Sequence, residues 1–378
     1  MLLDLESIPL FDHHCHGVVR RDLDRAAFEA LLTEADGAGP LGGSMFDTQA
    51  GLAVRRWCAP VLDLSPHAEP DAYLARRAEL GASEVNRRFL AAAGLSGLCV
   101  DTGYLPESML EPAELGKLAG APAHEVVRLE TVAEQVASEG MSVGAFTGEV
   151  RARLAARAAT AAGAKSIAAY RAGLELAGER PRDNEVAQAA ARLLREADRA
   201  MAGRSAPPRV CDEVMHRFLV WCAVDLGLPV QFHVGYGDSE TDLRRGDPLL
   251  LTDLLRAVQP TGVPMMLLHN YPFHRQAGYL AQVFPHVFVD VGLATHNLGH
   301  RAPALVAELL ELAPFGKVLY SSDAFGLAEF HHLGALLFRR ALARYLREGV
   351  ADDAWTEHDA RRLAGLVAEG NARRAYGR

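Results

Sequence analysis

The chain has 378 residues, 49% of them apolar and 23% charged, which is the composition of a globular protein with a large core. Its formal net charge of −9, without a block of lysines and arginines, argues against a nucleic-acid-binding surface. No apolar stretch approaches the roughly 18 residues of a membrane-spanning helix, and the acidic start of the chain lacks the basic region of a signal peptide.

The first predicted strand ends on two histidines. The apolar run Ile8–Phe11 leads into Asp12-His-His-Cys-His-Gly17. Side chains alternate along a strand, so His14 and His16 should project from one side, about 6.6 Å apart along the chain. That separation allows one divalent cation to bind both imidazoles. Cys15, between them, should point to the opposite face, where we expect it to pack.

Residues 18–94 separate the first strand from the second and contain helical patterns, including residues 21–33 and 71–93. We interpret this stretch as a helical insertion that covers the site and could act as a lid.

From about residue 95 onward, short apolar strands alternate with helical patterns. The predicted strands are residues 97–101, 126–130, 165–171, 230–233, 265–269, 287–291 and 318–321. Such alternation predicts parallel strands joined by helical crossovers. With the first strand included, it predicts an α/β fold of the (β/α)8 TIM-like barrel type, as one domain over residues 1–378. A doubly wound open sheet is the alternative, but it would not readily bring the first, fifth, sixth and eighth strands around one point.

Three later strands also end on residues that can bind a metal. His233 ends the fifth strand, His269 ends the sixth, and Asp323 follows the eighth. Strands of a parallel barrel end at a common rim, where barrel enzymes have their active sites. Each histidine alone could equally be a core residue, but together the four strand ends predict one shared site. Three other histidines do not stand at strand ends and are expected at the surface or behind the site: His286, His296 and His300.

Several motifs run in order across nearly the whole chain, and the insertion is the part they cover least. They are Asp12–Gly17, Lys165–Leu174, Gln231–Asp238, Leu268–Phe273, Phe288–Gly292, Ser321–Gly326 and Gly370–Tyr376. In these motifs the chain resembles the amidohydrolase superfamily, and within it the amidohydrolase-2 group related to the N-terminal domain of fungal FluG and to plant nodulin-6-like proteins. The resemblance implies a distorted (β/α)8 barrel with a mononuclear or binuclear metal centre.

The resemblance also implies which residues form that centre. Carried over to this sequence, they are His14, His16, His233, His269 and Asp323. Binuclear members add a carboxylated lysine or a glutamate at the C-terminal end of the fourth strand. Lys165 stands at the start of the predicted fourth strand, about 15–20 Å from its exit. We therefore expect one metal.

Neutral imidazoles and a carboxylate suit Zn²⁺, and also Mn²⁺ or Fe²⁺. We predict that His14, His16, His233 and Asp323 are the ligands and that the metal activates a water molecule. Asp323 is the expected base, which passes the water's proton to the leaving group. His269 is interpreted as polarising the scissile carbonyl, with metal ligation as the alternative.

Five residues near the strand ends are candidates for binding the substrate. Tyr170 and Arg171 stand where the fourth strand should end, and Arg171 could grip a substrate carboxylate through a bidentate pair. A structural salt bridge is an equally good interpretation of this arginine. Tyr236 and Asp238 lie in the glycine-rich turn after the fifth strand, and Asn270 follows the sixth. The simpler alternatives for these positions are tight turning and loop capping.

We therefore expect a metal-dependent hydrolase that cleaves a C–N bond, in an amide of a small carboxylated substrate. Relatives are fused to, or encoded near, glutamine-synthetase-like ligases, so the resemblance implies a γ-glutamyl amide. A metal-dependent decarboxylase on the same barrel is the first alternative, and a non-catalytic regulatory barrel is the second. The expected partner is a small molecule, not a nucleic acid or a membrane, and a homo-oligomer is left open. Five cysteines without a Cys-x-x-Cys pair indicate reduced thiols and a cytoplasmic protein.

Overall fold

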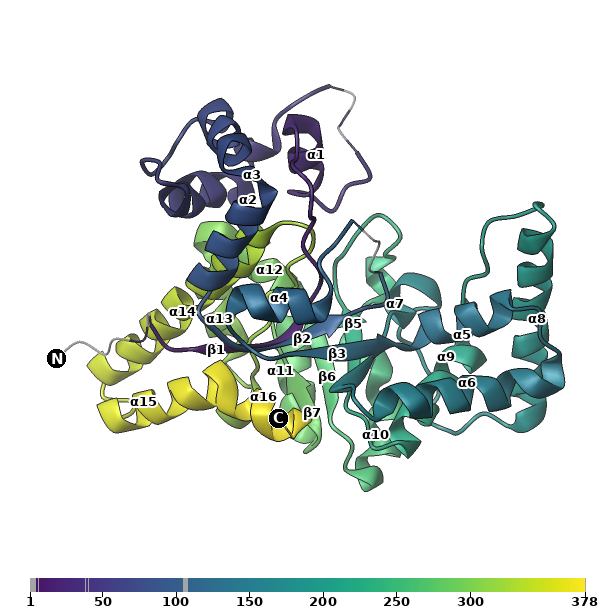
Figure 1. Ribbon diagram of the computed structural model, residues 1–378. Coiled ribbons are helices and arrows are strands. Elements are labelled where there is room, and N and C mark those ends of the chain that lie inside the picture. Colours follow the sequence, from purple (N-terminus) through teal and green to yellow (C-terminus); the bar gives the residue numbers. More distant parts are fainter. Residues whose placement is uncertain (1–4, 6, 38, 40, 105–107, 378) are drawn as a thin grey trace.

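In the computed structural model, the described residues (5, 7–37, 39, 41–104 and 108–377) form one seven-stranded parallel sheet surrounded by helices (Figure 1). Hydrogen-bonded neighbours follow chain order, as expected when each strand is joined to the next by a helical crossover. The strands are β1 (Leu10–Cys15), β2 (Leu95–Asp101), β3 (Ala123–Arg128), β4 (Gly163–Ser166), β5 (Val230–Val234), β6 (Met265–His269) and β7 (Val287–Val289).

The segment predicted as an eighth strand lies between β7 and β1 without forming a regular strand. On one side Leu319 N donates to Val289 O at 2.9 Å, and on the other His13 N donates to Tyr320 O at 3.1 Å. A single residue pair bridges this segment to β7. The prediction of a TIM-like α/β barrel is therefore confirmed, whereas the prediction of a regular strand over residues 318–321 is wrong.

Two other strand predictions need correction. β3 ends at Arg128, and the next helix begins at Leu129, so Glu130 is helical. β4 covers Gly163–Ser166 instead of residues 165–171. Its buried residues are mostly small and lack the β-branched side chains that usually indicate a strand, so the sequence pattern placed it too late.

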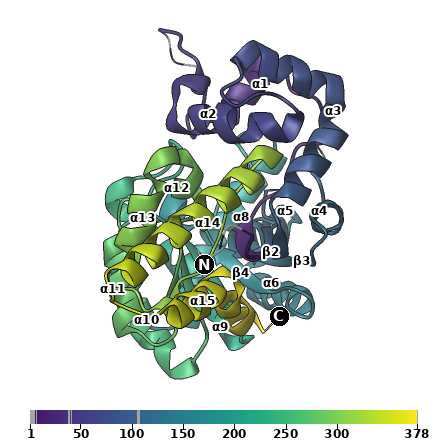
Figure 2. The same ribbon diagram turned by 90° about the vertical axis from the view of Figure 1, so that its left-hand side faces the viewer.

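Helices cover the outside of the sheet and the end at which the strands terminate (Figures 1 and 2). Among the described residues no helix is both long and apolar enough to cross a membrane. The α-helices are α1 (Arg25–Ala30), α2 (Gln49–Ala53), α3 (Pro70–Ala92), α4 (Pro112–Ala119), α5 (Leu129–Ser138), α6 (Val143–Ala158), α7 (Ala168–Arg171), α8 (Asp183–Met201), α9 (Glu213–Asp225), α10 (Thr252–Val258), α11 (His274–Val283), α12 (Gly292–Asn297), α13 (Ala302–Leu309), α14 (Ala328–Ala351), α15 (Glu357–Gly365) and α16 (Asn371–Tyr376).

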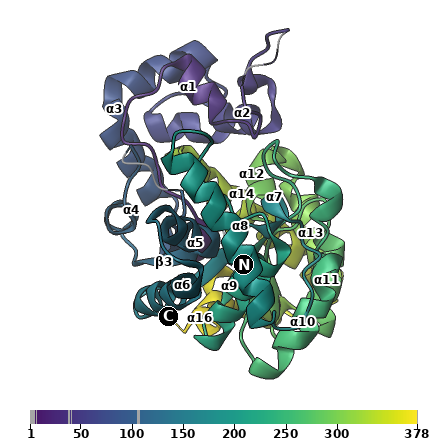
Figure 3. The same ribbon diagram turned by 90° about the vertical axis from the view of Figure 1, so that its right-hand side faces the viewer.

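The predicted insertion consists of α1, α2 and α3 with short 3-10 and π-helical turns, and it stands at one end of the molecule (Figures 2 and 3). A buried ion pair fixes it to α14, because Arg77 Nε lies 2.7 Å from Glu329 Oε1. The Tyr73 hydroxyl donates to the same oxygen at 3.1 Å. Glu329 is therefore not on the solvated face that is usual for such residues, but holds the insertion in place.

Candidate active site

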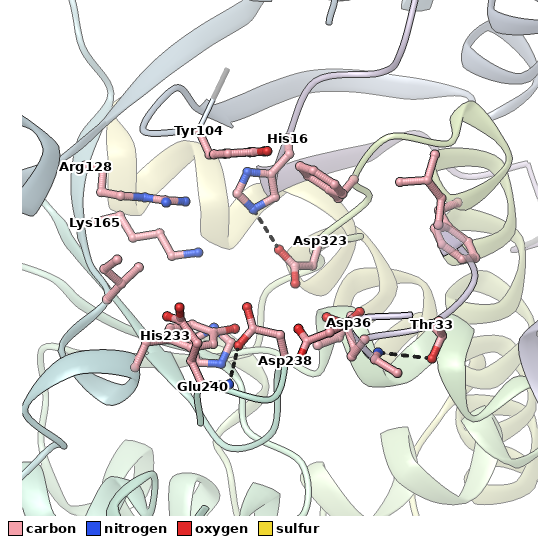
Figure 4. Close-up of a pocket in the computed structure, with 18 of the residues that line it drawn as sticks. His16, Thr33, Asp36, Tyr104, Arg128, Lys165, His233, Asp238, Glu240 and Asp323 are labelled. Atoms are coloured by element: carbon pink, nitrogen blue, oxygen red, sulfur yellow. Dashed lines mark hydrogen bonds and ion pairs between the residues drawn. The ribbon is translucent and has the colours of Figure 1, made fainter. Parts of the chain in front are cut away.

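Two histidines and an aspartate meet where the barrel closes. His14 Nε2 lies 3.0 Å from Asp323 Oδ1. His16 Nε2 lies 3.3 Å from the same oxygen (Figure 4). One ligand atom from each of these residues lies within 4.8 Å of the others. The backbone supports this approach, since Asp323 N donates to His14 O at 3.0 Å. Three of the four predicted metal ligands are thus brought together.

His233 and His269 lie beside this group at the ends of β5 and β6. Their ring centroids are 4.7 Å apart, and His269 Nδ1 lies 3.5 Å from Asp323 Oδ2. His233 does not join the compact group of three, but it borders the same cavity. In the described part of the chain, His233 Nε2 and both ring nitrogens of His269 are buried without a hydrogen-bond partner. Buried polar atoms of this kind are costly unless something binds them, so they fit a cation.

The ionisation of these groups also suits a cation. Burial and then the ammonium of Lys165 lower the pKa of His14 to about 3, and burial lowers that of His269 to about 4. Burial and the nearby His269 likewise hold the pKa of His233 well below its usual value. Burial opposes ionisation of Asp323, but the nearby His269 and the close contacts with His14 and His16 lower its pKa well below the ordinary value. The result is a set of neutral imidazoles around a carboxylate, which suits Zn²⁺, Mn²⁺ or Fe²⁺.

Lys165 lies inside this site, contrary to the prediction that it stands far from it. Its Nζ lies 2.8 Å from His14 Nε2 and 3.7 Å from Asp101 Oδ2, and that oxygen also binds Arg128 Nη2 at 2.7 Å. The prediction was wrong because β4 begins two residues before Lys165 and ends one residue after it. The distance argument for a single metal therefore fails, and the number of metals stays a prediction.

Gln231 sets the orientation of the His14 ring. Its Nε2 donates to His13 O at 2.7 Å and to the Tyr376 hydroxyl at 2.8 Å, so its Oε1 must accept the hydrogen of His14 Nδ1 at 2.9 Å. That tautomer leaves a lone pair on His14 Nε2, directed at the site. Such a supporting contact is typical of histidines that bind metals.

A second set of contacts holds the loop that carries Asp323. Ser322 N and Oγ donate to the two carboxylate oxygens of Asp12 at 2.9 and 2.6 Å. Ala324 N in turn donates to Ser322 Oγ at 3.0 Å. Asp323 between them has φ of 49°, a left-handed conformation that is uncommon outside glycine and needs support from its surroundings. Asp12 thus positions Asp323.

His16, Lys165, His233 and Asp323 border a cavity of about 470 Å³ whose lining is rich in charge (Figure 4). The insertion forms part of its wall through residues 30–31 and 33–36. Asp36 Oδ2 accepts a hydrogen bond from Ser239 Oγ at 2.5 Å, which joins the insertion to the loop after β5. The charged lining residues are Arg128, Lys165, Arg171, Arg209, Glu34, Asp36, Asp238, Glu240 and Asp323.

Three of the five predicted substrate-binding residues border this cavity. They are Tyr170, Arg171 and Asp238. The Tyr170 ring packs on that of His233, with centroids 4.2 Å apart. Arg171 Nη1 lies 2.6 Å from Glu240 Oε2, so the alternative of a salt bridge is realised, although Arg171 still faces the cavity. Both Tyr170 and Arg171 lie on α7 and not at the end of a strand.

Tyr236 and Asn270 have structural roles instead. The Tyr236 hydroxyl accepts a hydrogen bond from Asn297 Nδ2 at 2.6 Å. Asn270 is fully buried, and its Nδ2 donates to the carbonyls of Leu267 and Asp290. Neither is among the described residues that border the cavity, and the substrate contact of both stays a prediction.

The sequence interpretation missed other residues of the site. Asp101 ends β2 as the predicted bounds have it, so the strand-end pattern that identified His233 would have identified it as well. Arg128 borders the cavity and ends β3, but the strand was predicted to continue to residue 130, so the pattern did not point to Arg128. His296 also borders the cavity, contrary to its expected place at the surface or behind the site. Its ring stacks on Phe330 with centroids 4.2 Å apart. His296 lies in α12, and no sequence pattern indicated that it would border the cavity.

Comparison with known proteins agrees with this site. Residues 112–378 match the model of the family described as Amidohydrolase. The chain belongs to the amidohydrolase family. The amidohydrolase-2 group expected from the motifs is thereby confirmed, and membership implies a divalent metal, which the donor set described above fits.

Two relatives of this amidohydrolase match almost its whole length. Protein fluG of Emericella nidulans is 26% identical over 411 residues, which cover 98% of the chain and 46% of fluG, so the chain spans about half the length of this curated relative. The crystal structure of a Lactobacillus casei protein described as a metal-dependent hydrolase has 29% identity and a TM-score of 0.84, covering 99% of this chain and 96% of that one.

A uronate isomerase from Bacillus halodurans shares the fold alone. It has 14% identity and a TM-score of 0.66, covering 99% of the amidohydrolase chain and 94% of its own.

Proposed function

We propose that this amidohydrolase is a metal-dependent hydrolase that cleaves the C–N bond of an amide of a small carboxylated compound, with γ-glutamyl amides as the first class to test. The observation that carries the proposal is the convergence of His14, His16 and Asp323 at a cavity with cationic side chains in its wall. Membership in the amidohydrolase family supports the same chemistry.

His14, His16, His233 and Asp323 would hold the metal, and we propose zinc, with manganese and iron as alternatives. A divalent cation held there supplies a water molecule of lowered pKa and polarises a carbonyl group. The buried nitrogens without hydrogen-bond partners support this assignment, because they are available for ligation.

The protein's own groups would move the proton. Asp323 is ionised, so it can accept the proton of the attacking water and deliver it to the leaving nitrogen. His269 lies 3.5 Å from the same carboxylate and is neutral, so a ring N–H can donate to the carbonyl oxygen of the substrate. The Asp12–Ser322 contacts keep Asp323 in the conformation that these transfers need.

The carboxylate of the substrate would be held by two arginines in the cavity wall. Arg171 and Arg209 both lie against Glu240, at 2.6 and 2.5 Å, so two guanidinium groups are close together there. Guanidinium groups bind carboxylates through paired hydrogen bonds.

The test is elemental analysis of the purified protein, combined with turnover of a panel of γ-glutamyl amides before chelation, after chelation and after metal is restored. We expect a bound divalent metal and release of free amine that stops on chelation and returns with metal. Carbon dioxide is measured in the same reactions. Amine release that survives removal of every metal, or release of carbon dioxide instead of amine, would overturn the proposal.

A further inference from the structure

Part of the cavity wall next to His16 is apolar. Phe325, two residues after Asp323, places its ring edge against the His16 ring with centroids 5.7 Å apart. Tyr104 packs on Phe325 at 5.8 Å between centroids. Leu31 reaches this side from the insertion, and all these residues border the cavity.

Gly326 allows Leu31 to reach this position. A Cβ atom on Gly326 would lie 2.8 Å from Leu31 Cδ2, closer than two such atoms can approach. Gly326 also has φ of 72°, which favours glycine. The start of the insertion is joined to the same turn, since Val19 N donates to Gly326 O at 2.9 Å. The apolar side is therefore built jointly by the barrel loop and the insertion.

The other side of the cavity, next to His233, is polar and carries charges of both signs. Tyr170 packs on His233, and Arg171 and Glu240 lie close by. Figure 4 shows Tyr104 and His16, with Arg128 and Lys165 beside them, on one side of Asp323, and His233, Asp238 and Glu240 on the other. The candidate metal centre thus lies between the surface formed by Leu31, Tyr104 and Phe325 and the part of the wall that carries Arg171 and Glu240.

From this arrangement we propose that the apolar side, formed by Leu31, Tyr104 and Phe325, binds the leaving amine, and that the enzyme prefers amides of hydrophobic amines to those of polar amines or ammonia. The inference rests on the proposed amide hydrolysis. In an amide, the acyl group and the amine extend in opposite directions from the scissile bond. When the charged side holds the carboxylated acyl group and the reacting carbonyl lies at the centre, the amine substituent points to the apolar side.

The expected preference follows from burial of apolar surface. One methylene group in an apolar pocket changes kcat/KM by roughly tenfold or more when it is fully enclosed. Leu31 and Phe325 are only partly buried, so this apolar surface is open to water. Each methylene group should therefore change kcat/KM by less than it does in an enclosed pocket. For a terminal methyl group against a hydroxyl of the same length, we expect a ratio of about ten.

The experiment compares γ-glutamyl butylamide with γ-glutamyl 3-hydroxypropylamide, which have side chains of equal length, and includes the primary amide. We expect kcat/KM for the butylamide to exceed that for the hydroxypropylamide by about tenfold. Leu31→Asn, which keeps the size of the side chain, should bring the ratio close to one, whereas Leu31→Met should retain most of it. Leu312→Ser serves as the matched control, because Leu312 is 48% exposed and is not among the cavity-lining residues described.

Equal kcat/KM for the two amides, or a ratio that Leu31→Asn leaves unchanged while the thermal midpoint is normal, would overturn the inference and leave amide hydrolysis intact. Absence of turnover for all three amides with metal-loaded protein would instead overturn the proposed function. Calorimetric binding of the same two amides to chelated protein then tests the apolar side separately. The inference is supported when the butylamide binds more tightly than the hydroxypropylamide and Leu31→Asn abolishes this difference. Equal or undetectable binding of both amides overturns the inference.

Discussion

Lys165 Nζ lies 2.8 Å from His14 Nε2, although the two residues are 151 positions apart in the chain. Because His14 Nδ1 donates to Gln231, the Nε2 atom carries the lone pair that accepts a hydrogen from Lys165. A metal at His14 would need that same lone pair. The ammonium of Lys165 and a metal cation are therefore competitors for one atom, and they also repel each other.

We accordingly expect Lys165→Met to bind metal more tightly than the natural protein, by at least about tenfold, because a buried positive charge next to the ligand is removed. Competition titration with a chromogenic chelator measures the change. Lys117→Met, at an exposed position of α4, is the matched control. A loss of bound metal in Lys165→Met would show that Lys165 is itself a ligand and would support a binuclear centre.

Asp323→Asn should reduce turnover by at least about a hundredfold, because it removes both an anionic ligand and the group that moves the proton. Metal content should fall with it, and elemental analysis of the variant checks this. His358→Ala, which removes an exposed histidine in α15, should change neither quantity. Full activity of Asp323→Asn would contradict the role assigned to the carboxylate.

Gln231→Leu should leave the His14 Nδ1 hydrogen and the His13 carbonyl buried without a partner. Each such group costs about 1–3 kcal/mol, so the free energy of unfolding should fall by about 2–6 kcal/mol for the two groups. Metal affinity should fall by about 10- to 100-fold, because the ring of His14 loses its orientation. Chemical denaturation and metal titration measure the two effects, with the exposed Gln135→Leu as the control. Reduced stability with unchanged metal affinity would mean that Gln231 does not orient a ligand.

The sequence predicted those elements whose own residues carry a clear pattern. β6 matches its predicted bounds, Met265–His269, because it is an uninterrupted apolar run. The predicted bounds of β4 were wrong because its buried residues are mostly small and do not show the pattern of β-branched and apolar residues that indicates a strand. The closing segment at residues 318–321 was predicted as a regular strand from its apolar residues, but it pairs with β7 and β1 through few hydrogen bonds, which its own residue pattern does not show.

The same distinction applies to the site. Strand-end histidines were found because parallel strands terminate at one rim, a rule that depends on topology alone. Lys165 was missed because its place depended on the bounds of β4, and His296 because it borders the cavity from a helix. Local pattern therefore located the centre, whereas the lining depended on contacts between distant parts of the chain.

Glu134 on α5 should make stability depend on pH. Burial raises the pKa of Glu134 to about 7. The hydrogen bond that its carboxylate accepts from Val210 N at 2.9 Å acts in the opposite direction but is the smaller effect. A raised pKa means that the folded state favours the protonated form, so this stabilisation is complete below about pH 4.5 and is lost as the pH rises through about 7. Glu134→Gln keeps the acceptor and cannot ionise, so it should be more stable than the natural protein at pH 8, by about 1–2 kcal/mol, and similar at pH 4.5. Denaturation curves at both values test this, and an equal difference at both would contradict it.

The buried pair of Arg77 and Glu329 should determine whether the insertion stays attached. Arg77→Met leaves the Glu329 carboxylate buried, with the Tyr73 hydroxyl as its remaining side-chain partner among the residues that the structure describes. Breaking one side of a buried ion pair costs about 3–5 kcal/mol, because the remaining charge is uncompensated. Arg77→Met combined with Glu329→Gln removes that charge and should recover a large part of the loss. Urea denaturation measures both variants, and limited proteolysis shows whether cleavage begins within residues 18–94, as expected when α3 separates from α14. A double variant no more stable than Arg77→Met alone would show that lost packing, and not the unpaired charge, causes the effect.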